Sequence, residues 1–293
     1  MARGRDRRGG PRHGGDAGRD PGRGGPRDAG AARHDVSTVD LRGRGALVTG
    51  ASRGIGVAVA SALAGAGVRV VLAARTEADL VREVDALRRA GHEAWPVPCD
   101  VTDEADVARL AARAREVLGD VEVLVNNAGD AASAPLRKIT LEDWNRMLAI
   151  NATSAFLVTR ASAPAMVERG FGRIVNLAST AGLEGAKYVA HYCAAKHAVI
   201  GFTRALAVEL KGTGVTVNAL CPGYADTPLT ARTVENVQAH TGLDREGALA
   251  AVLASARQTR LVRPDEVASA VLALCGDPSA NGQAVVVLGE EAR

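Results

Sequence analysis

The chain has 293 residues, of which 47% are hydrophobic, 24% charged and 3% aromatic, which is the composition of a globular protein with an aliphatic core. No apolar run approaches the roughly 18 residues that cross a bilayer, and the amino-terminal segment lacks the apolar stretch of a secretory signal, so we expect no membrane association and a cytoplasmic location. The net charge of +3 comes from the first 35 residues, with nine Arg and five Asp, because the remainder holds 27 Lys and Arg against 28 Asp and Glu. The body of the chain therefore has no basic surplus, and nucleic acid is not an expected partner.

Residues 1–43 differ in composition from everything that follows. No Ile, Leu, Val, Phe, Tyr or Trp precedes Val36, and ten of the first 35 residues are Gly. Such a segment cannot bury enough apolar surface to offset its ordering entropy, so we expect a disordered Arg/Gly-rich leader. An RNA-binding tail and a transit peptide are alternatives, but interleaved Asp residues and the lack of aromatics favour a dispensable leader or a start codon assigned too early, with Val36 as the true start.

From residue 44 short apolar runs alternate with longer amphipathic segments. The runs predict seven buried strands, at 46–49, 68–73, 94–99, 121–125, 173–177, 215–219 and 284–288. Helical patterns lie between them, for example at 76–90, 104–118 and 141–168. Strands that alternate with helices indicate an α/β fold: a single Rossmann-like, doubly wound, seven-stranded parallel sheet with helices on both faces, in one domain at 44–293.

The first predicted strand leads into a glycine-rich turn, Thr49-Gly50-Ala51-Ser52-Arg53-Gly54-Ile55-Gly56. A turn of this kind between a strand and a helix lets the backbone approach a pyrophosphate, whose charge the helix N-terminus favours. The spacing is TGxxxGxG rather than GxGxxG. After the fourth strand comes Asn126-Asn127-Ala128-Gly129, and after the sixth come Pro222-Gly223 and Thr227.

These motifs resemble those of the short-chain dehydrogenase/reductase family over residues 44–288. The resemblance implies that Asn127, Ala128 and Gly129 line the cofactor pocket and that Pro222, Gly223 and Thr227 contact the nicotinamide end. It also implies that Asp100, followed by Val101 just past the third strand, hydrogen-bonds the adenine.

The residues at the end of the second strand predict which cofactor binds. An enzyme that uses NAD places an acidic residue there for the ribose 2′-hydroxyl, whereas this strand ends Leu72-Ala73-Ala74-Arg75. Arg75 can offer a planar, charge-assisted fork to a 2′-phosphate, and Arg53 in the glycine turn adds a second cation. We therefore expect NADP(H).

The segment 179–196 carries the predicted chemistry. Tyr192 and Lys196 are spaced i, i+4 and share one helix face, Ser179 follows the fifth strand, and Asn151 lies inside a helical run although Asn is a poor helix former. Together they match the family's Asn, Ser, Tyr-x-x-x-Lys tetrad. Tyr192 is expected to donate or accept the proton of a carbonyl/alcohol conversion, with its pKa lowered by the Lys196 ammonium and the positive charge of the nicotinamide.

The resemblance implies supporting roles for the rest of the tetrad. Ser179 is expected to hydrogen-bond the substrate oxygen, Lys196 to hold the nicotinamide ribose, and Asn151 to hold a water that relays protons to Lys196. His191, His197 and His240 are expected to be partly exposed or hydrogen-bonded helix residues rather than pocket residues. None of the four cysteines forms a CxxC pair or accompanies a His cluster, so we expect buried thiols and no metal site.

Residues 224–260 are a predicted lid over the substrate, with helical runs at 233–240 and 245–257. The stretches GRIVNLAST at 172–180 and YCAAKHAVIGFT at 192–203 resemble 3-oxoacyl thioester reductases and aromatic-polyketide ketoreductases. Two features depart from them: Asp130-Ala131-Ala132-Ser133 replaces Pro-Gly-Gly after the NNAG motif, and the last strand ends Leu288-Gly289-Glu290.

The expected function is NADP(H)-dependent reduction of a ketone to a secondary alcohol, on a 3-oxoacyl thioester or polyketide-like substrate. The alternative within enzymes is a secondary-alcohol or hydroxyacyl dehydrogenase that acts oxidatively on a non-thioester substrate. A cofactor-binding regulatory protein without turnover is a third hypothesis, against which the complete tetrad argues. The resemblance also implies a homotetramer built on the helices of the fourth and fifth crossovers and the final strand.

Overall fold

The computed structural model describes residues 38–289, so the predicted leader lies outside the described residues except for its last six. Those six belong to the folded unit, because Leu41 is buried in the core and the Val39 N–H donates to the Gly276 carbonyl at 2.8 Å. The domain therefore begins before residue 44.

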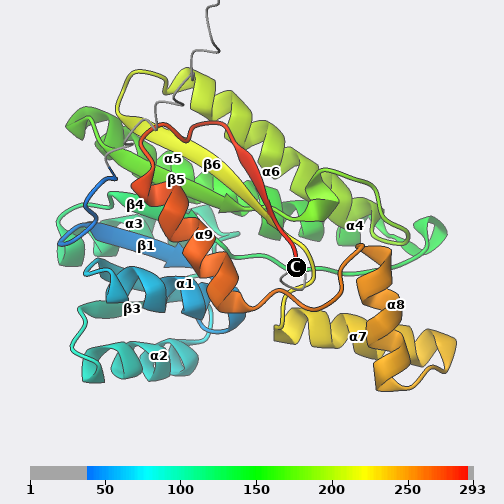
Figure 1. Cartoon of the computed structure of the whole chain (residues 1–293). Helices are drawn as coiled ribbons and strands as arrows, with labels where there is room; N and C mark the ends of the chain where they lie inside the picture. Colours follow the sequence, from blue (N-terminus) through cyan, green and yellow to red (C-terminus); the bar gives the residue numbers. More distant parts are fainter. Residues whose placement is uncertain (1–37, 290–293) are drawn as a thin grey trace, which may run out of the picture. The chain divides into compact units, whose positions relative to one another are not determined.

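The seven predicted strands form one parallel sheet, which confirms the predicted fold class (Figure 1). The strands run in the order β3-β2-β1-β4-β5-β6-β7. Their bounds are β1 Gly45–Thr49, β2 Arg69–Ala74, β3 Ala94–Pro98, β4 Val123–Asn126, β5 Gly172–Leu177, β6 Val215–Pro222 and β7 Ala284–Val287. Since all are parallel, their carboxyl ends meet at one edge, and the winding reverses between β1 and β4. Ligands bind at such a reversal in open α/β sheets.

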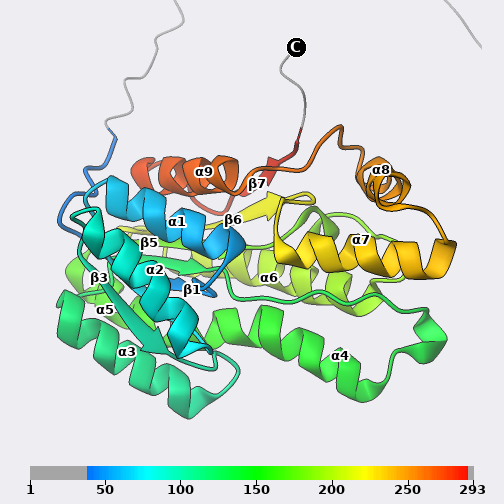
Figure 2. The same ribbon diagram turned by 90° about the horizontal axis from the view of Figure 1, so that it is seen from below.

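Helices cover both faces because alternate side chains of each buried strand point to opposite sides. In β1, Ala46 and Val48 pack into one core with α1 (Gly54–Gly65), α2 (Glu77–Arg89) and α9 (Pro264–Gly276). Leu47, between them, packs into the other core with α3 (Glu104–Leu118), α5 (Ser154–Arg169) and α6 (Ala190–Glu209). Figure 2 shows α1 and α9 on one side of the sheet and α3 on the other.

The helix ends follow from local capping chemistry. Asp103 caps α3 by accepting from the Asp106 N–H at 2.8 Å, and Thr140 forms a capping box with Asp143 at the start of α4 (Leu141–Leu148). Gly170 ends α5 in the left-handed conformation that glycine tolerates. The predicted helix at 141–168 is therefore two helices, which a π-helical turn at Ala149–Thr153 separates. No helix within residues 38–289 is long and apolar enough to cross a bilayer.

A buried polar chain crosses the sheet beside the site. The Asn126 side-chain amide on β4 donates to Thr159 on α5 and to Asn176 on β5, both at 2.8 Å. Asn176 in turn donates to the Thr203 hydroxyl on α6 at 2.9 Å. Because a buried polar group must be paired, this chain sets how α5 and α6 sit against the two strands.

Candidate active site

The glycine-rich turn after β1 places bare backbone at the carboxyl edge of the sheet. Gly50 (φ +64°) and Gly54 (φ +56°) adopt left-handed conformations, and a Cβ on Gly56 would lie 2.3 Å from the Gly50 carbonyl oxygen. The turn leads into α1, where Arg53 occupies the N-cap position and its side chain makes no capping hydrogen bond within the described residues. The amino-terminal N–H groups of α1 therefore point to the space that an anion would occupy. Six predicted cofactor-binding residues lie in this turn and the start of α1: Gly50, Ser52, Arg53, Gly54, Ile55 and Gly56.

The NNAG motif braces this turn from the neighbouring strand. The Asn127 side-chain amide donates to the carbonyls of Thr49 at 2.9 Å and Gly50 at 3.1 Å, and the Ala128 N–H donates to the Thr49 hydroxyl at 3.1 Å. The Asn127 side chain therefore acts on the candidate cofactor site indirectly, by holding the glycine turn in place.

The predicted adenosine end lies past β2 and β3. Arg75 is exposed directly after β2, where it is close enough to Asp100 to lower the pKa of that carboxyl, after the larger effect of hydrogen bonds from Thr102. The Asp100 carboxylate accepts hydrogen bonds from the Thr102 N–H at 2.9 Å and from the Thr102 hydroxyl at 2.7 Å. The side chain of Val101 is buried. Arginine, rather than a carboxylate, therefore stands at the end of β2.

Asn151 is placed by the π-helical turn Ala149–Thr153. Its side-chain amide donates to the Met147 carbonyl at 3.0 Å and to the Asp130 carbonyl at 2.9 Å. Its Oδ1 is buried and has no hydrogen-bond partner among the described residues. A π-turn widens a helix by one residue and is frequent at functional sites, and an unpaired buried acceptor is costly. Both features indicate that Asn151 Oδ1 faces a ligand or water site.

The side chain of Lys196, on α6, ends close to the Asn151 Oδ1 atom. A Cβ on Gly129 would lie 2.8 Å from Asn151 Oδ1 and 3.5 Å from Lys196 Nζ, so the absence of a side chain at Gly129 leaves the space between them open. Lys196 is buried, and its ammonium donates to the Leu177 carbonyl at 2.8 Å. Burial lowers the pKa of Lys196 to about 8.

Tyr192 lies one helical turn before Lys196, with its ring centre 5.8 Å from Lys196 Nζ. Ser179 caps a 3₁₀ turn (Thr180–Gly182), where its hydroxyl accepts from the Ala181 N–H at 3.2 Å, and it also hydrogen-bonds the Tyr192 side chain. Burial raises the pKa of Tyr192 to about 12, and the Ser179 hydrogen bond opposes this in part. Desolvation is the largest cause of this rise in the protein itself. The lowering expected from Lys196 together with the nicotinamide charge stays a prediction for the complex with the oxidised cofactor.

The predicted nicotinamide contacts come from the end of β6 and the segment after it. Pro222 ends β6, the Gly223 N–H donates to the Val287 carbonyl at 3.0 Å, and Thr227 caps α7 (Pro228–Thr241). The Thr227 methyl lies 3.2 Å from where a Cβ on Gly54 would be. The start of α7 therefore covers the glycine turn, which brings two predicted groups of cofactor residues together across 173 positions of sequence.

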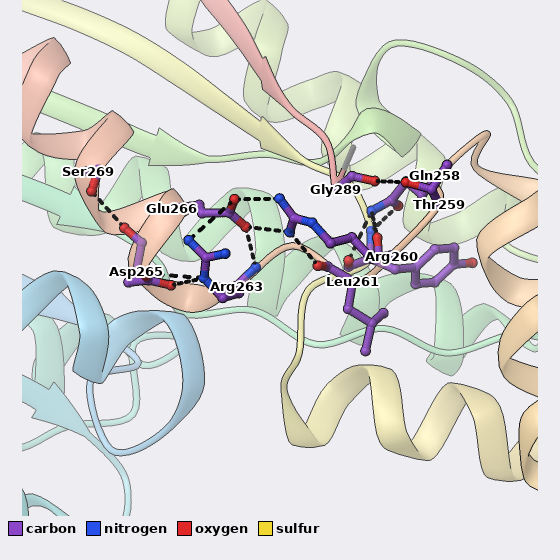
Figure 3. Close-up of polar contacts among 10 residues, drawn as sticks. Gln258, Thr259, Arg260, Leu261, Arg263, Asp265, Glu266, Ser269 and Gly289 are labelled. Carbon is purple, nitrogen blue, oxygen red and sulfur yellow. Dashed lines mark hydrogen bonds and ion pairs between the residues drawn. The ribbon is translucent and has the colours of Figure 1, made fainter. Parts of the chain in front are cut away.

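The predicted lid consists of α7 and α8 (Arg245–Ser255), beyond the carboxyl edge of the sheet in Figures 1 and 2. Gln258, to which the sequence analysis assigned no role, closes its base (Figure 3). The buried Gln258 amide accepts from the Tyr224 N–H at 2.7 Å and donates to the carbonyls of Tyr224 at 3.2 Å and Arg260 at 3.1 Å. Arg260 continues the contact into α9 through two hydrogen bonds to Glu266, at 2.7 and 2.8 Å.

The histidines differ in part from expectation. His197 and His240 are hydrogen-bonded to carbonyls one turn earlier on their helices, as predicted. His191 is buried, and its Nδ1 has no partner among the described residues, so that prediction was wrong. His191 lies at the start of α6, near Asp143 and Arg146 of α4, a placement that its position beside Tyr192 in sequence did not reveal. All four cysteines are buried and free, and residues 38–289 hold no group of three His, Cys, Asp or Glu suited to a metal ion.

A parallel doubly wound sheet with a glycine turn at its reversal point and a Tyr–Lys helix beside it defines a nucleotide-dependent α/β oxidoreductase site. A sequence model of the short chain dehydrogenase family matches residues 44–238. The chain belongs to this family and is an oxidoreductase of the short-chain type.

Relatives and solved structures agree with this assignment over most of the chain. The 3-oxoacyl-acyl-carrier-protein reductase of Synechocystis sp. is 39% identical over 238 residues, which are 80% of this chain and 90% of that protein. The D-beta-hydroxybutyrate dehydrogenase of Rhizobium meliloti is 35% identical over 239 residues, 80% and 92% of the two chains. The crystal structure of an actinorhodin polyketide ketoreductase variant with NADPH superimposes with a TM-score of 0.80 at 40% identity, covering 86% of this chain and 98% of that one.

Proposed function

We propose that this protein uses NADPH to reduce a ketone to a secondary alcohol, with a 3-oxoacyl thioester or polyketide-like compound as substrate. The observation that carries the proposal is the convergence of Asn151 Oδ1 and Lys196 Nζ beneath Gly129, beside the hydrogen-bonded Ser179 and Tyr192. The similarity to a ketoreductase that binds NADPH and to a 3-oxoacyl reductase supports both the cofactor and the substrate class.

The residues present fit NADP(H). The uncapped start of α1 and the left-handed Gly50 and Gly54 leave backbone N–H groups for a pyrophosphate. Arg75 and Arg53 are both exposed at the end where a 2′-phosphate would lie, and the last residue of β2 is Ala74 rather than an acid. When bound, the cofactor supplies the hydride that the carbonyl carbon receives.

The side chains have complementary tasks around the carbonyl oxygen. The Tyr192 hydroxyl donates the proton, and its raised pKa keeps it protonated at neutral pH, as a proton donor in reduction must be. The Ser179 hydroxyl hydrogen-bonds the same oxygen and stabilises the developing negative charge. Lys196, fixed by the Leu177 carbonyl, has its ammonium 5.8 Å from the Tyr192 ring centre and stabilises the phenolate that remains. Asn151 Oδ1 accepts a hydrogen bond from the water that returns a proton toward Lys196.

Tyr192→Phe tests the chemistry. We expect NADPH oxidation with a 3-oxobutanoyl thioester to fall by at least about 100-fold, which is the contribution of one positioned general acid. The dissociation constant for NADPH, measured by fluorescence, should change by no more than about a factor of two, because the Tyr192 hydroxyl is assigned to the substrate oxygen and not to the cofactor. Turnover by the Phe variant at the wild-type rate would refute the proposed mechanism.

Arg75→Ser tests the cofactor choice. A guanidinium fork on a phosphate is a charge-assisted contact worth about 1.5–3 kcal/mol, so the Michaelis constant for NADPH should rise about 10- to 100-fold while that for NADH changes little. Arg69→Ser, at the other end of β2, is the matched control. A wild-type preference for NADH would contradict the assignment.

The alternative is an oxidative secondary-alcohol or hydroxyacyl dehydrogenase, which the similarity to a D-beta-hydroxybutyrate dehydrogenase supports. A panel of ketones, 3-oxoacyl thioesters, quinones and hydroxy acids, assayed in both directions, discriminates the two. Turnover restricted to hydroxy-acid oxidation would favour the alternative.

We also propose a homotetramer that uses α5, α6 and β7. Phe156 on α5 and Phe202 on α6 form an edge-to-face pair with ring centres 6.2 Å apart, yet Phe156 is 42% exposed, and Val286 on β7 is exposed as well. Aromatic side chains left at a surface are typical of interface anchors. In light scattering, the wild-type protein should have the mass of a tetramer and the Phe156→Glu variant a smaller mass. A monomeric wild type would contradict the proposal.

A further inference from the structure

Asp130 connects the NNAG loop to the predicted lid. It follows Gly129 directly, and its Oδ1 accepts a hydrogen bond from the Arg232 guanidinium of α7 at 2.7 Å. Arg232 lies just over one turn into α7, whose first residues cover the glycine turn. The ion pair therefore joins the loop after the NNAG motif to α7, and it is a separate contact from the Gln258 hydrogen bonds at the base of the predicted lid.

The backbone of the same residue holds a member of the tetrad. The Asp130 carbonyl accepts from the Asn151 side-chain amide at 2.9 Å, and that amide is the group whose Oδ1 faces the open space below Gly129. A shift of the Asp130 backbone therefore moves the Asn151 amide, and with it the acceptor opposite Lys196. One residue thus contacts the lid through its side chain and the tetrad through its carbonyl.

The charges around this contact are balanced. Arg146 on α4 lies 3.6 Å from the second Asp130 oxygen and 3.8 Å from Asp143, so two arginines face two carboxylates. The side chains of Asp130 and Arg232 are 30% and 54% exposed, which keeps the pair in partial contact with water. An ion pair of this exposure changes an equilibrium by up to about fivefold, which suits a contact that forms and breaks.

We propose that Asp130 is a positioning residue that couples docking of α7 to the placement of Asn151. With the Arg232 contact made, the NNAG loop is held against α7 and the Asn151 amide is fixed below Gly129. With the contact broken, α7 loosens and Asn151 loses its fixed orientation. The catalytic part of this inference rests on the proposed function, whereas the lid contact does not.

Hydrogen exchange of the α7 amides tests the lid contact in the full-length protein. Asp130→Asn and Arg232→Gln should each speed exchange across Pro228–Thr241 about two- to fivefold, because each removes the Asp130–Arg232 ion pair. Asp130→Asn also removes the longer contact with Arg146, which lies on α4 rather than on α7. The double variant should exchange no faster than Asp130→Asn alone, because the two changes remove one shared ion pair. Unchanged α7 exchange in both single variants, or additive effects in the double variant, would overturn the proposal.

Arg169→Gln is the matched control. Arg169 pairs with Asp120 at 2.6 Å with side chains 55% and 22% exposed, close to the values of the Asp130 pair, but it joins the end of α5 to the residues before β4. It should leave both α7 exchange and turnover as in the wild type.

Steady-state kinetics test the coupling to Asn151. Arg232→Gln should lower kcat about as much as Asp130→Asn does, although Arg232 contacts none of the tetrad residues within the described chain. A rise in KM with kcat unchanged in both variants would overturn the coupling. A wild-type protein that reduces no ketone would refute the proposed function, and the exchange measurement would still decide the lid contact.

Discussion

Gln258→Leu is the most informative perturbation of the lid base. Gln258 is buried, and its amide makes three hydrogen bonds that tie residues 224 and 260 together where the predicted lid leaves and rejoins the domain. Leucine has nearly the same volume and no polar atoms. The change therefore removes the hydrogen bonds without opening a large cavity.

The expected cost follows from those three contacts. Each net hydrogen bond contributes about 0.5–1.5 kcal/mol, and the part-buried Tyr224 N–H, which donates to Gln258 at 2.7 Å, loses that acceptor. Burial of the leucine side chain returns part of the loss, about 1 kcal/mol. We expect the free energy of unfolding to fall by about 2–3 kcal/mol.

Urea unfolding followed by circular dichroism measures the stability, and NADPH fluorescence measures binding. Because Tyr224 follows the predicted cofactor residue Gly223, a loosened lid base should also weaken NADPH binding about tenfold, which corresponds to about 1.4 kcal/mol. Gln283→Leu, at an exposed glutamine just before β7, is the control for the chemical change. Equal unfolding midpoints for the two variants would refute the reasoning.

Three further predictions concern single positions. Gly129→Ala places a methyl group 2.8 Å from Asn151 Oδ1, so we expect a folded protein with kcat lowered at least about tenfold, checked by circular dichroism and NADPH oxidation. Asn176→Leu, at a fully buried residue of the polar chain, should cost about 2–4 kcal/mol in urea unfolding; a loss below about 1 kcal/mol would argue against a structural role for the chain. Hydrogen bonds from Arg260 lower the pKa of Glu266 to about 2, so its stabilisation is present above its unfolded value of 4.5 and is lost as pH falls toward 2. The stability difference between wild type and Glu266→Gln should therefore narrow over that range, and a difference that widens in acid would contradict this.

The sheet could be predicted because buried parallel strands are continuous apolar runs. All seven strands occur where the runs are, with differences of one to three residues at their ends. The largest difference is at β6, which continues through Leu220 and Cys221 to Pro222. Proline is tolerated at the end of that strand because it has no N–H to donate and none is required there.

The helical layer was less predictable. Periodicity marked 141–168 as one helix, since the apolar positions continue on both sides of residue 150. A π-turn adds one residue and shifts the apolar face, but the chain stays helical through Ala149–Thr153, which contains no Gly or Pro to mark a helix end. The poor helix propensity of Asn151 was the one sequence clue, and Asn151 lies inside the π-turn.

In the candidate site too, local spacing was predictable from the sequence and contacts between distant segments were not. Spacing alone brought Tyr192 and Lys196 to one helix face, because i and i+4 are neighbours on any α-helix. Contacts between distant segments had no such signal: Asp130 and Arg232 are 102 positions apart in a chain with 32 arginines. The pKa of Tyr192 also depends on its burial in the folded chain, which no sequence pattern reports.

The strand order has a consequence for synthesis of the chain on the ribosome. β1, β2 and β3 are local neighbours and can pair as soon as they emerge, but the second partner of β1 is β4, whose residues follow about 77 positions later. Until β4 has been made, the nascent sheet presents β1 as an open edge in which Thr49 is the only polar residue, the kind of edge that recruits foreign strands. The strand β1, which is central in the finished sheet, is thus an exposed edge in the incomplete sheet. Chaperone dependence during translation should therefore peak in the interval before residue 126 emerges.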